Sequence, residues 1–440
     1  MKPAKAAFET LVPRLSDTLP GPDSTSLSAD SLSAQAQSLP WWLRALVKRL
    51  EQANVSRVRI CLAKEQADTG MALPTPAQEL TLGQASAGVP IPRIKIHRLR
   101  AMLRGWLNGT VGWAEGYIAK DWDCDDIVDL TDWAMANETA LENAFSGSQV
   151  STWINRLLHR LNNNTRRGSR RNIAFHYDLG NDFYRLWLDS SMTYSSALFA
   201  NPQQSLVDAQ CNKNRRILEL LDPKPGHKVL EVGCGWGGFG ETLMQHSDCQ
   251  WHGVTLSKEQ LAWSQQRLEP YADRAKATLT DYRDIDQQYD RIVSIEMLEA
   301  VGEANWPEYF KQLKRHLKPG GKAVIQVITI DNDRFTYYRD HTDFIQRYIF
   351  PGGMLPSPDA MRQQLASAGL QLQLEQSFGQ DYATTLQHWH RNFCSSWPQI
   401  EPQGFDPHFY RLWRYYLAYC ESGFKAGSID VRLYQIQAPH

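Results

Sequence analysis

The fold of this 440-residue chain is decided by the stretch Lys228-Val229-Leu230-Glu231-Val232-Gly233-Cys234-Gly235-Trp236-Gly237-Gly238. Its apolar start, Lys228–Val232, predicts a buried strand, and residues 239–245 predict the helix that follows. The glycines between them allow a ligand to approach the backbone closely, next to a helix N-terminus with free N–H groups. The stretch is therefore typical of a loop that binds a nucleotide-like ligand.

The alternation of strand and helix continues after this loop. Further strands are predicted at 250–254, 277–279, 291–295 and 323–330, and a further helix at Lys258–Arg267. Strands that alternate with helices predict a doubly wound parallel sheet, which is the Rossmann-like α/β class. The C-terminal part is predicted to be rich in helices and aromatic residues, without an internal repeat.

The length of the chain predicts more than one domain, because single cores stop growing at about 250–300 residues. Residues 1–40, rich in Ser, Pro and Ala, are expected to form a disordered leader. Residues 41–145 are expected to form a small N-terminal α+β domain, with an amphipathic helix and a strand at Val58–Leu62. A basic connector at 146–172 then leads to the nucleotide-binding domain at 173–440.

Composition excludes several classes of protein. The net charge of −1 gives the whole molecule no general attraction for nucleic acid. The seven cysteines are scattered and show no metal-ligand spacing, so we expect reduced thiols and no metal site. No signal peptide and no run of 18 apolar residues is found, so a cytoplasmic enzyme is expected.

The connector contains six arginines, and they allow two interpretations. They can form an ordinary solvated linker. Alternatively they can contact phospholipid headgroups, where each basic residue near an anionic surface contributes ~1 kcal/mol. The six are Arg156, Arg160, Arg166, Arg167, Arg170 and Arg171.

The glycine loop matches the dinucleotide pattern GxGxxG, but its surroundings favour a different ligand. Glu231, two positions before Gly233, can hold a positively charged amino-acid ligand. The second strand leads to Thr255 rather than to the acidic residue that a dinucleotide ribose requires. Asp281 follows the third strand and can accept the adenine amino group, with Tyr282 covering the ring. This order predicts the nucleotide site of a methyltransferase.

Six ordered motifs resemble the cyclopropane-fatty-acid synthases and their mycolic-acid relatives. They lie at 176–184, 192–197, 230–238, 253–260, 281–284 and 348–353, and the segment 113–122 resembles the small N-terminal domain of the full-length bacterial enzymes. The resemblance implies a class I methyltransferase domain with a smaller lipid-binding-type domain. It implies methyl transfer from S-adenosylmethionine to a double bond of an unsaturated phospholipid, at the inner face of the membrane.

The resemblance also implies which residues hold S-adenosylmethionine. Tyr194 and the segment 176–178 are expected to close over it, the loop glycines to approach its methionine end, and Gln260 to hold its ribose. The complete set is Tyr177, Tyr194, Ser195, Glu231, Gly233, Gly235, Thr255, Gln260, Asp281 and Tyr282.

The sequence departs from the family at the catalytic base. In the ring-forming synthases, a Cys, a Glu, a His and a Tyr hold a bicarbonate ion that acts as the base. This chain keeps the Glu and the Tyr, as Glu299 and Tyr382. It has Ser196 where the Cys is expected and Gln326 where the His is expected.

A new carboxylate, Glu296, stands where the family usually has glycine, and Ala300 stands where it has His. Glu296 can be a neutral change, solvated or in a salt bridge. Alternatively it supplies the carboxylate that bicarbonate supplies elsewhere, because two confined anions would repel each other. We therefore expect Glu296, Glu299, Tyr382, Gln326 and Ser196 to form the catalytic group.

Several alternatives remain open from the sequence. The product can be a cyclopropane fatty acid, or a methyl- or methylene-branched chain if the cation is quenched differently. A non-catalytic lipid- or nucleotide-binding relative and a small-molecule C-methyltransferase are further alternatives, the latter disfavoured by the lipid-type domain. The oligomeric state is also open, with a homodimer among the choices.

Overall fold

The computed structural model describes residues 41–62, 79–98, 100–145 and 179–440. The chain divides into two compact units, Met1–Arg49 and Leu50–His440. The expected leader at 1–40, the basic connector at 146–172 and Tyr177 lie outside the described residues. The domain boundaries expected from the sequence therefore stay a prediction.

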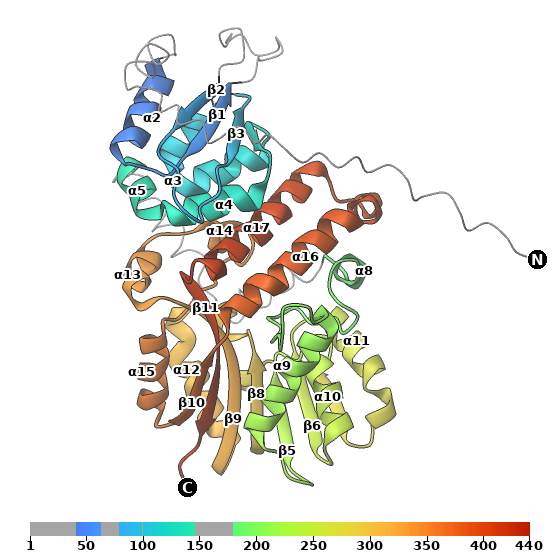
Figure 1. Ribbon diagram of the computed structural model, residues 1–440. Helices are drawn as coiled ribbons and strands as arrows, with labels where there is room; N and C mark the ends of the chain where they lie inside the picture. Colours follow the sequence, from blue (N-terminus) through green and yellow to red (C-terminus); the bar gives the residue numbers. More distant parts are fainter. Residues whose placement is uncertain (1–40, 63–78, 99, 146–178) are drawn as a thin grey trace, which may run out of the picture. The chain divides into compact units, whose positions relative to one another are not determined.

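A seven-stranded sheet forms the centre of the larger unit, with strand order β10-β11-β9-β8-β5-β6-β7 (Figure 1). The first five strands of this sheet in chain order, β5 to β9, pair in parallel, which confirms the doubly wound α/β class. Their bounds are β5 (Lys228–Val232), β6 (Gln250–Thr255), β7 (Ala275–Leu279), β8 (Tyr289–Ile295) and β9 (Leu317–Ile330).

The sheet is not wholly parallel, because β11 (Ile429–Gln437) runs antiparallel between β9 and β10 (Gln371–Ser377). The prediction of a helix-rich C-terminal part missed these two strands. Both contain polar residues in alternation with apolar ones, as in the sequences QLQLEQS and IDVRLYQIQ. Such a pattern resembles a surface segment, and only the return of the chain past two long helices brings β11 beside β9.

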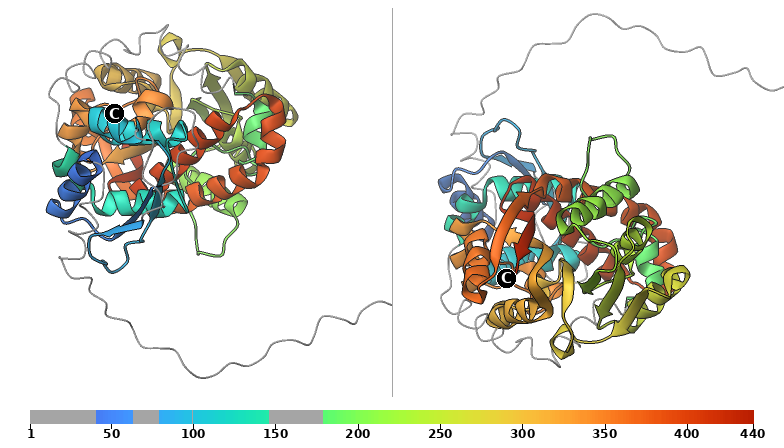
Figure 2. Two further views of the ribbon diagram at one scale, coloured as in Figure 1. Left: turned by 90° about the horizontal axis from the view of Figure 1, so that it is seen from above. Right: turned by 90° about the horizontal axis from the view of Figure 1, so that it is seen from below.

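Helices cover both faces of the sheet (Figures 1 and 2). One face is covered by α9 (Leu206–Leu221), α10 (Gly238–His246) and α11 (Lys258–Arg267), and the other by α12 (Trp306–His316) and α15 (Pro358–Ala368). Because both faces are covered, the central strands are buried along their length, which explains their nearly continuous apolar sequences.

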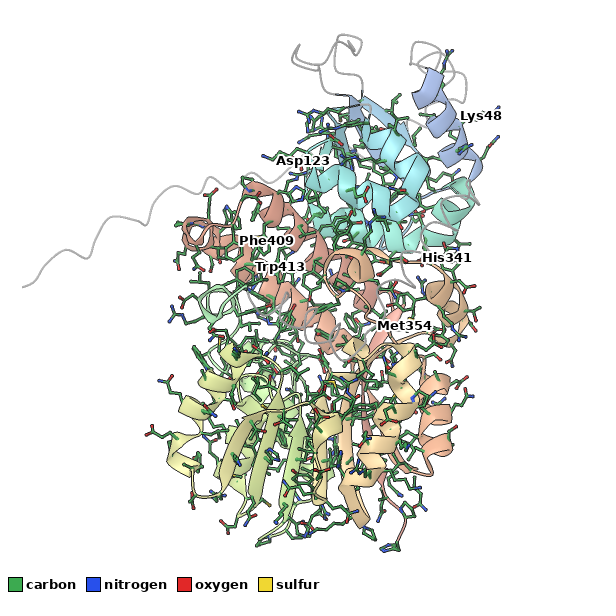
Figure 3. All side chains as sticks on the ribbon, turned by 180° about the vertical axis from the view of Figure 1, so that it is seen from behind. Lys48, Asp123, His341, Met354, Phe409 and Trp413 are labelled. Atoms are coloured by element: carbon green, nitrogen blue, oxygen red, sulfur yellow. The ribbon has the colours of Figure 1, made fainter. Side chains whose placement is uncertain are left out.

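Two long helices, α16 (Gly379–Ile400) and α17 (Pro407–Lys425), pack against each other after the parallel strands. Phe409 and Trp413, one turn apart on α17 (Figure 3), stack with their ring centroids 5.3 Å apart. Shorter helices are α8 (Asn181–Arg185), α13 (Asn332–Asp340) and α14 (Phe344–Tyr348). Across the described ranges, no helix has both the length and the apolar character needed to cross a membrane.

A second sheet of four strands, in the order β2-β1-β3-β4, belongs to the N-terminal part. Its strands are β1 (Val58–Leu62), β2 (Glu79–Leu82), β3 (Arg93–Ile96) and β4 (Trp122–Cys124). The helices here are α2 (Trp41–Gln52), α3 (Arg100–Ile118), α4 (Ile127–Ala136) and α5 (Glu138–Phe145). The mixture of helices and strands agrees with the expected α+β character.

Arg411 of α17 joins this small sheet to the rest of the larger unit. Its guanidinium donates to the carbonyl oxygen of Tyr117 at 2.6 Å and to that of Trp122 at 3.0 Å. It also lies over the Tyr117 ring, 3.8 Å from the centroid. The segment 113–122, which resembles the small domain of related enzymes, thus contacts α17, and α4 packs against the same helix.

Candidate active site

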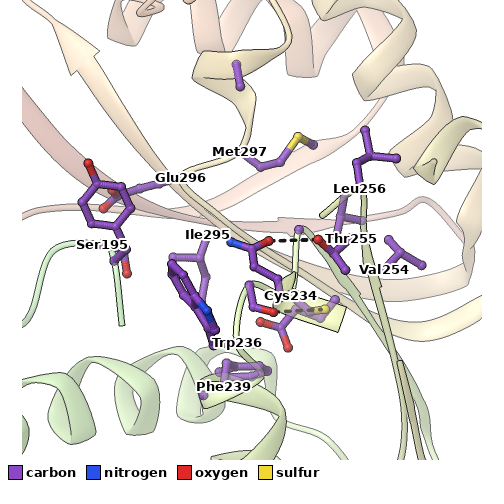
Figure 4. A pocket seen from close by; sticks show the side chains of 18 of the residues that line it. Ser195, Cys234, Trp236, Phe239, Val254, Thr255, Leu256, Ile295, Glu296 and Met297 are labelled. Atoms are coloured by element: carbon purple, nitrogen blue, oxygen red, sulfur yellow. Dashed lines mark hydrogen bonds between the residues drawn. The ribbon is translucent and has the colours of Figure 1, made fainter. Parts of the chain in front are cut away.

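A pocket opens at the carboxyl ends of β5, β6 and β8 (Figure 4). The chain leaves β5 toward β6 on one side, while β8 pairs with β5 on the other side, so this is the switch point where doubly wound sheets bind ligands. Nine of the ten predicted cofactor residues line the pocket, and Tyr177 lies outside the described residues. The nine are Tyr194, Ser195, Glu231, Gly233, Gly235, Thr255, Gln260, Asp281 and Tyr282.

The glycine loop forms one wall of this pocket in a left-handed backbone conformation. Gly235 has a φ of 52°, and a Cβ built on it meets no protein atom within 4 Å. A Cβ on Gly237 would instead lie 2.7 Å from Oγ of Ser264. Gly237 is therefore required for packing against α11, whereas Gly235 leaves open a space that a ligand can fill.

Glu231 lies beneath the loop and is almost fully buried, with 3% of its surface exposed. One of its carboxyl oxygens accepts a hydrogen bond from Nε1 of Trp251 at 2.9 Å. Burial raises the pKa of Glu231 to about 8. A cationic ligand beside it would favour the ionised form, so this carboxyl suits a ligand with an ammonium or sulfonium group.

Polar groups suited to a nucleoside line the other end of the pocket. The hydroxyl of Thr255 donates to Oε1 of Gln260 at 2.9 Å, which fixes the amide with its nitrogen as the donor. The Asp281 carboxylate accepts from Arg283, at 2.8 Å from Nε and 2.6 Å from Nη2. Carboxylate oxygens have several lone pairs, so Asp281 can still accept an adenine amino group. Its role remains a prediction.

The C-terminal helices position Tyr194 at the pocket. Its hydroxyl pairs with that of Tyr416 on α17 at 2.8 Å, and its ring lies 5.2 Å from that of Trp389 on α16. Sequence reasoning missed Tyr416 and Trp389, and the aromatic content of the C-terminal helices was the available signal.

The predicted catalytic residues meet at the carboxylate of Glu296. Its Oε1 accepts the backbone N–H of Ser196 at 2.9 Å and Nε2 of Gln326 at 2.8 Å. Its Oε2 accepts the hydroxyl of Tyr382 at 2.6 Å. Glu296 lines the pocket, and the three donors lie behind it. Three residues of the altered anion cage therefore surround a carboxylate of the chain itself.

Ser196 takes part differently from the expectation. Its hydroxyl donates to the carbonyl oxygen of Ala197 at 2.9 Å, so only its backbone N–H faces Glu296. A serine hydroxyl commonly bonds to nearby backbone in this way. Main-chain geometry, rather than the side chain at position 196, supplies the donor.

Glu296 has a strained backbone. Its φ of 49° lies in the left-handed region, directly after β8, and its N–H donates to the carbonyl oxygen of Gln326 at 2.8 Å. For a residue with a Cβ this conformation costs roughly 1–2 kcal/mol, and such strain is concentrated at functional sites. A glycine would be free of this cost, which explains why the family's glycine fits this position.

Glu299 lies on the 3₁₀ turn Leu298–Ala300, half-buried with its Oε2 shielded from solvent, and outside the lining of the pocket. Its Oε1 accepts the N–H of Ile328 at 2.5 Å, and its Oε2 has no hydrogen-bond partner in the described part of the chain. Burial and, second, the charge of Glu296 raise its pKa to about 8. Glu299 is therefore mostly protonated at neutral pH. Burial raises the pKa of Glu296 as well, but the three hydrogen-bond donors oppose this shift and favour its ionised form.

Of the two carboxylates expected in the catalytic group, only Glu296 faces the pocket. The 3₁₀ turn directs Glu299 toward β9, although the two residues are only three positions apart. Sequence reasoning also missed a set of buried polar residues on α9, namely Gln210, Lys213 and Asn214. The available signal was their spacing of i, i+3 and i+4, which places them on an otherwise apolar face of the helix.

The glycine cradle, the buried carboxyl beneath it and the nucleoside-type polar groups define an S-adenosylmethionine-dependent methyltransferase. The model of the family "Mycolic acid cyclopropane synthetase" matches residues 164–435. The chain therefore belongs to this family, and S-adenosylmethionine is its methyl donor.

Named relatives agree with this assignment. The chain is 37% identical over 364 residues to the tuberculostearic acid methyltransferase UfaA1 of Mycobacterium tuberculosis, covering 77% of this chain and 82% of that protein. It is 34% identical over 343 residues to the cyclopropane-fatty-acyl-phospholipid synthase of Escherichia coli, covering 75% and 83%. The solved cyclopropane synthase MmaA2 of Mycobacterium tuberculosis is 29% identical with a TM-score of 0.57, covering 61% and 98%.

Proposed function

We propose that this enzyme adds a one-carbon unit to the double bond of an unsaturated fatty acyl chain, carried by a phospholipid. Membership of the family and the names of the two relatives support a lipid substrate. An alkene is an uncharged, weak nucleophile, so the enzyme has to align it and exclude water. The buried aromatic residues around Tyr194 are suited to that task.

The observation that carries the mechanism is the carboxylate of Glu296 in the centre of the donor cage. When bound, S-adenosylmethionine supplies a methyl group activated by its sulfonium. Forming a bond to that methyl leaves positive charge on the acyl chain, and an ionised Glu296 stabilises it. Glu296 then accepts the proton that the cation loses, so no added bicarbonate is required.

The carbon that loses the proton determines the product. Loss from the new methyl group closes a cyclopropane ring, which is our leading assignment. Loss from a neighbouring chain carbon gives a branched, unsaturated chain instead. Glu296 is tethered to β8, unlike a diffusible anion, and this difference makes a branched chain the second candidate.

A binding protein without catalysis is less consistent with the site. If the altered cage had lost its anion with nothing in its place, its donors would lack an acceptor, whereas all three donate to Glu296. We also infer that the enzyme works in the cytoplasm and contacts the inner face of the membrane peripherally. The basic residues of the connector support this inference through their attraction for anionic lipid.

The test is turnover of methyl-labelled S-adenosylmethionine with vesicles of unsaturated phospholipid. We expect label in the lipid, with mass spectrometry detecting the addition of CH₂ and hydrogenation distinguishing a ring from a branched alkene. Vesicles of saturated phospholipid are the matched control, since they contain no double bond. Absence of labelled lipid with folded protein that binds S-adenosylmethionine would contradict the proposed function.

A further inference from the structure

Helix α9 carries polar residues where packing alone calls for apolar ones. Gln210 and Lys213 are 0% and 1% exposed, on the face that also buries Ala209, Ile217 and Leu221. A buried lysine is costly unless it is paired, because its charge loses hydration. Something other than packing therefore accounts for these two residues.

Gln210 holds one side of a peptide group whose other side contacts Glu296. Its Nε2 donates to the carbonyl oxygen of Ser195 at 2.8 Å. The N–H of the same peptide group, which belongs to Ser196, donates to Oε1 of Glu296 at 2.9 Å. A donor on the carbonyl polarises the peptide and strengthens its N–H as a donor.

The amide oxygen of Gln210 argues against a purely structural role. This oxygen is buried and has no hydrogen-bond partner in the described ranges. An unsatisfied buried acceptor costs about 1–3 kcal/mol, and a methionine of similar length would avoid it. The benefit of Gln210 therefore lies in its single bond to Ser195.

Lys213 lies one turn further along α9 and acts on the same residue. Its Nζ donates to Oγ of Ser195 at 3.2 Å. The ionisable groups whose charge acts on it are Glu296 after β8, Glu231 on β5, Asp189 before the pocket, and Cys211 on α9. Lys213 lines the pocket beside Glu231 and Glu296. Burial lowers the pKa of Lys213 to about 8, against the opposing effect of these carboxyl groups, so at neutral pH it is mostly a cation next to them.

We propose that Gln210 and Lys213 are positioning residues for Glu296: Gln210 fixes the Ser195–Ser196 peptide as its hydrogen-bond donor, and Lys213 keeps its carboxylate ionised. The inference rests on the proposed role of Glu296 as the proton acceptor. It assigns the two residues distinct effects, because Gln210 acts through geometry and Lys213 acts through charge.

The first test measures the titration of Glu296 directly and requires no turnover. Protein labelled with ¹³C at the glutamate carboxyl groups is titrated by NMR, and the Glu296 signal is assigned by its loss in Glu296→Gln. In Lys213→Met we expect the midpoint of this signal to rise by about one pH unit, as for a carboxylate that loses a nearby cation. Lys213→Arg is expected to restore the midpoint, because it keeps the charge.

The second test measures kcat against pH with unsaturated phospholipid vesicles. In Lys213→Met the acid limb of the kcat profile is expected to move to higher pH, by the same interval as the Glu296 midpoint. In Gln210→Met the plateau of kcat is expected to fall ~10-fold, since a displaced donor no longer matches the acceptor, with the acid limb and S-adenosylmethionine affinity unchanged. The matched control is Arg215→Met, which removes an exposed basic side chain from the same helix. It should alter neither the acid limb nor the plateau of kcat.

The outcomes separate this inference from the function on which it rests. If the Glu296 midpoint is the same in Lys213→Met and the unaltered protein, the charge role of Lys213 is wrong. If Gln210→Met keeps full kcat, its positioning role is wrong. An unaltered protein that shows no lipid turnover contradicts the proposed function alone, because the NMR titration still decides the role of Lys213.

Discussion

Replacing Glu296 with glycine removes a carboxylate from the centre of three buried donors. The donors are the N–H of Ser196, Nε2 of Gln326 and the hydroxyl of Tyr382, at 2.9, 2.8 and 2.6 Å from the carboxyl oxygens. Each unpaired buried donor costs about 1–3 kcal/mol. Glycine also relieves roughly 1 kcal/mol of strain at the φ of 49°.

Water can satisfy the vacated donors in part, so the lower value of about 1 kcal/mol applies to each of the three. After the relief of backbone strain is subtracted, we expect Glu296→Gly to be about 2 kcal/mol less stable than the unaltered protein. Activity is expected to fall ~10²–10⁴-fold, as for loss of a general base. Bicarbonate has the charge and the oxygen acceptors that the donors require, so it should enter the space left by the side chain. Added bicarbonate is therefore expected to recover both stability and turnover in this variant.

The assay is turnover of labelled S-adenosylmethionine with unsaturated vesicles, in degassed buffer with and without bicarbonate. The unaltered enzyme should be equally active in both. Glu296→Gln is the control, because it fills the same space without a charge and should stay inactive in both. The reasoning is refuted if the unaltered enzyme is silent without bicarbonate and active with it, since Glu296 would then not replace that ion.

Three further predictions follow from other parts of the molecule. Gly235→Ala places a methyl group in the ligand space, where no protein atom lies within 4 Å. Asp281→Ala removes the expected adenine acceptor. Calorimetry should find weaker S-adenosylmethionine binding in both variants, with the fold intact. Replacing the four arginines of residues 166–171 with serine should reduce sedimentation of the protein with anionic vesicles at low salt and leave cofactor binding unchanged. Unchanged sedimentation would identify the connector as a plain linker. Burial raises the pKa of Glu299 to about 8, above its unfolded value near 4.5, so the folded state loses stability as the pH rises from about 4.5 to 8. Glu299→Gln should remove this loss of stability. In urea unfolding near pH 8 the variant should be a few kcal/mol more stable than the unaltered protein, at about 1.4 kcal/mol per pKa unit. An identical dependence of stability on pH in both proteins would contradict the burial of an uncharged carboxyl at this position.

The sequence by itself determined the parallel part of the sheet and the position of its ligand pocket. Strands such as Lys228–Val232 and the helix Lys258–Arg267 have the bounds predicted from their hydrophobic periodicity. The prediction of these elements succeeds because strands covered on both faces are continuously apolar, which is a local property of the chain. The glycine loop and Asp281 were found for the same reason, since each directly follows such a strand.

Only the tertiary structure decided which residues surround the carboxylate. The resemblance identified Glu296, Gln326 and Tyr382 separately, but their convergence depends on β8, β9 and α16 meeting at one point. The antiparallel β11 and the direction of Glu299 away from the pocket likewise depend on packing between distant segments. Gln210 was missed because its function is a hydrogen bond to a backbone carbonyl fifteen residues earlier, and no residue pattern encodes the direction of a single peptide group.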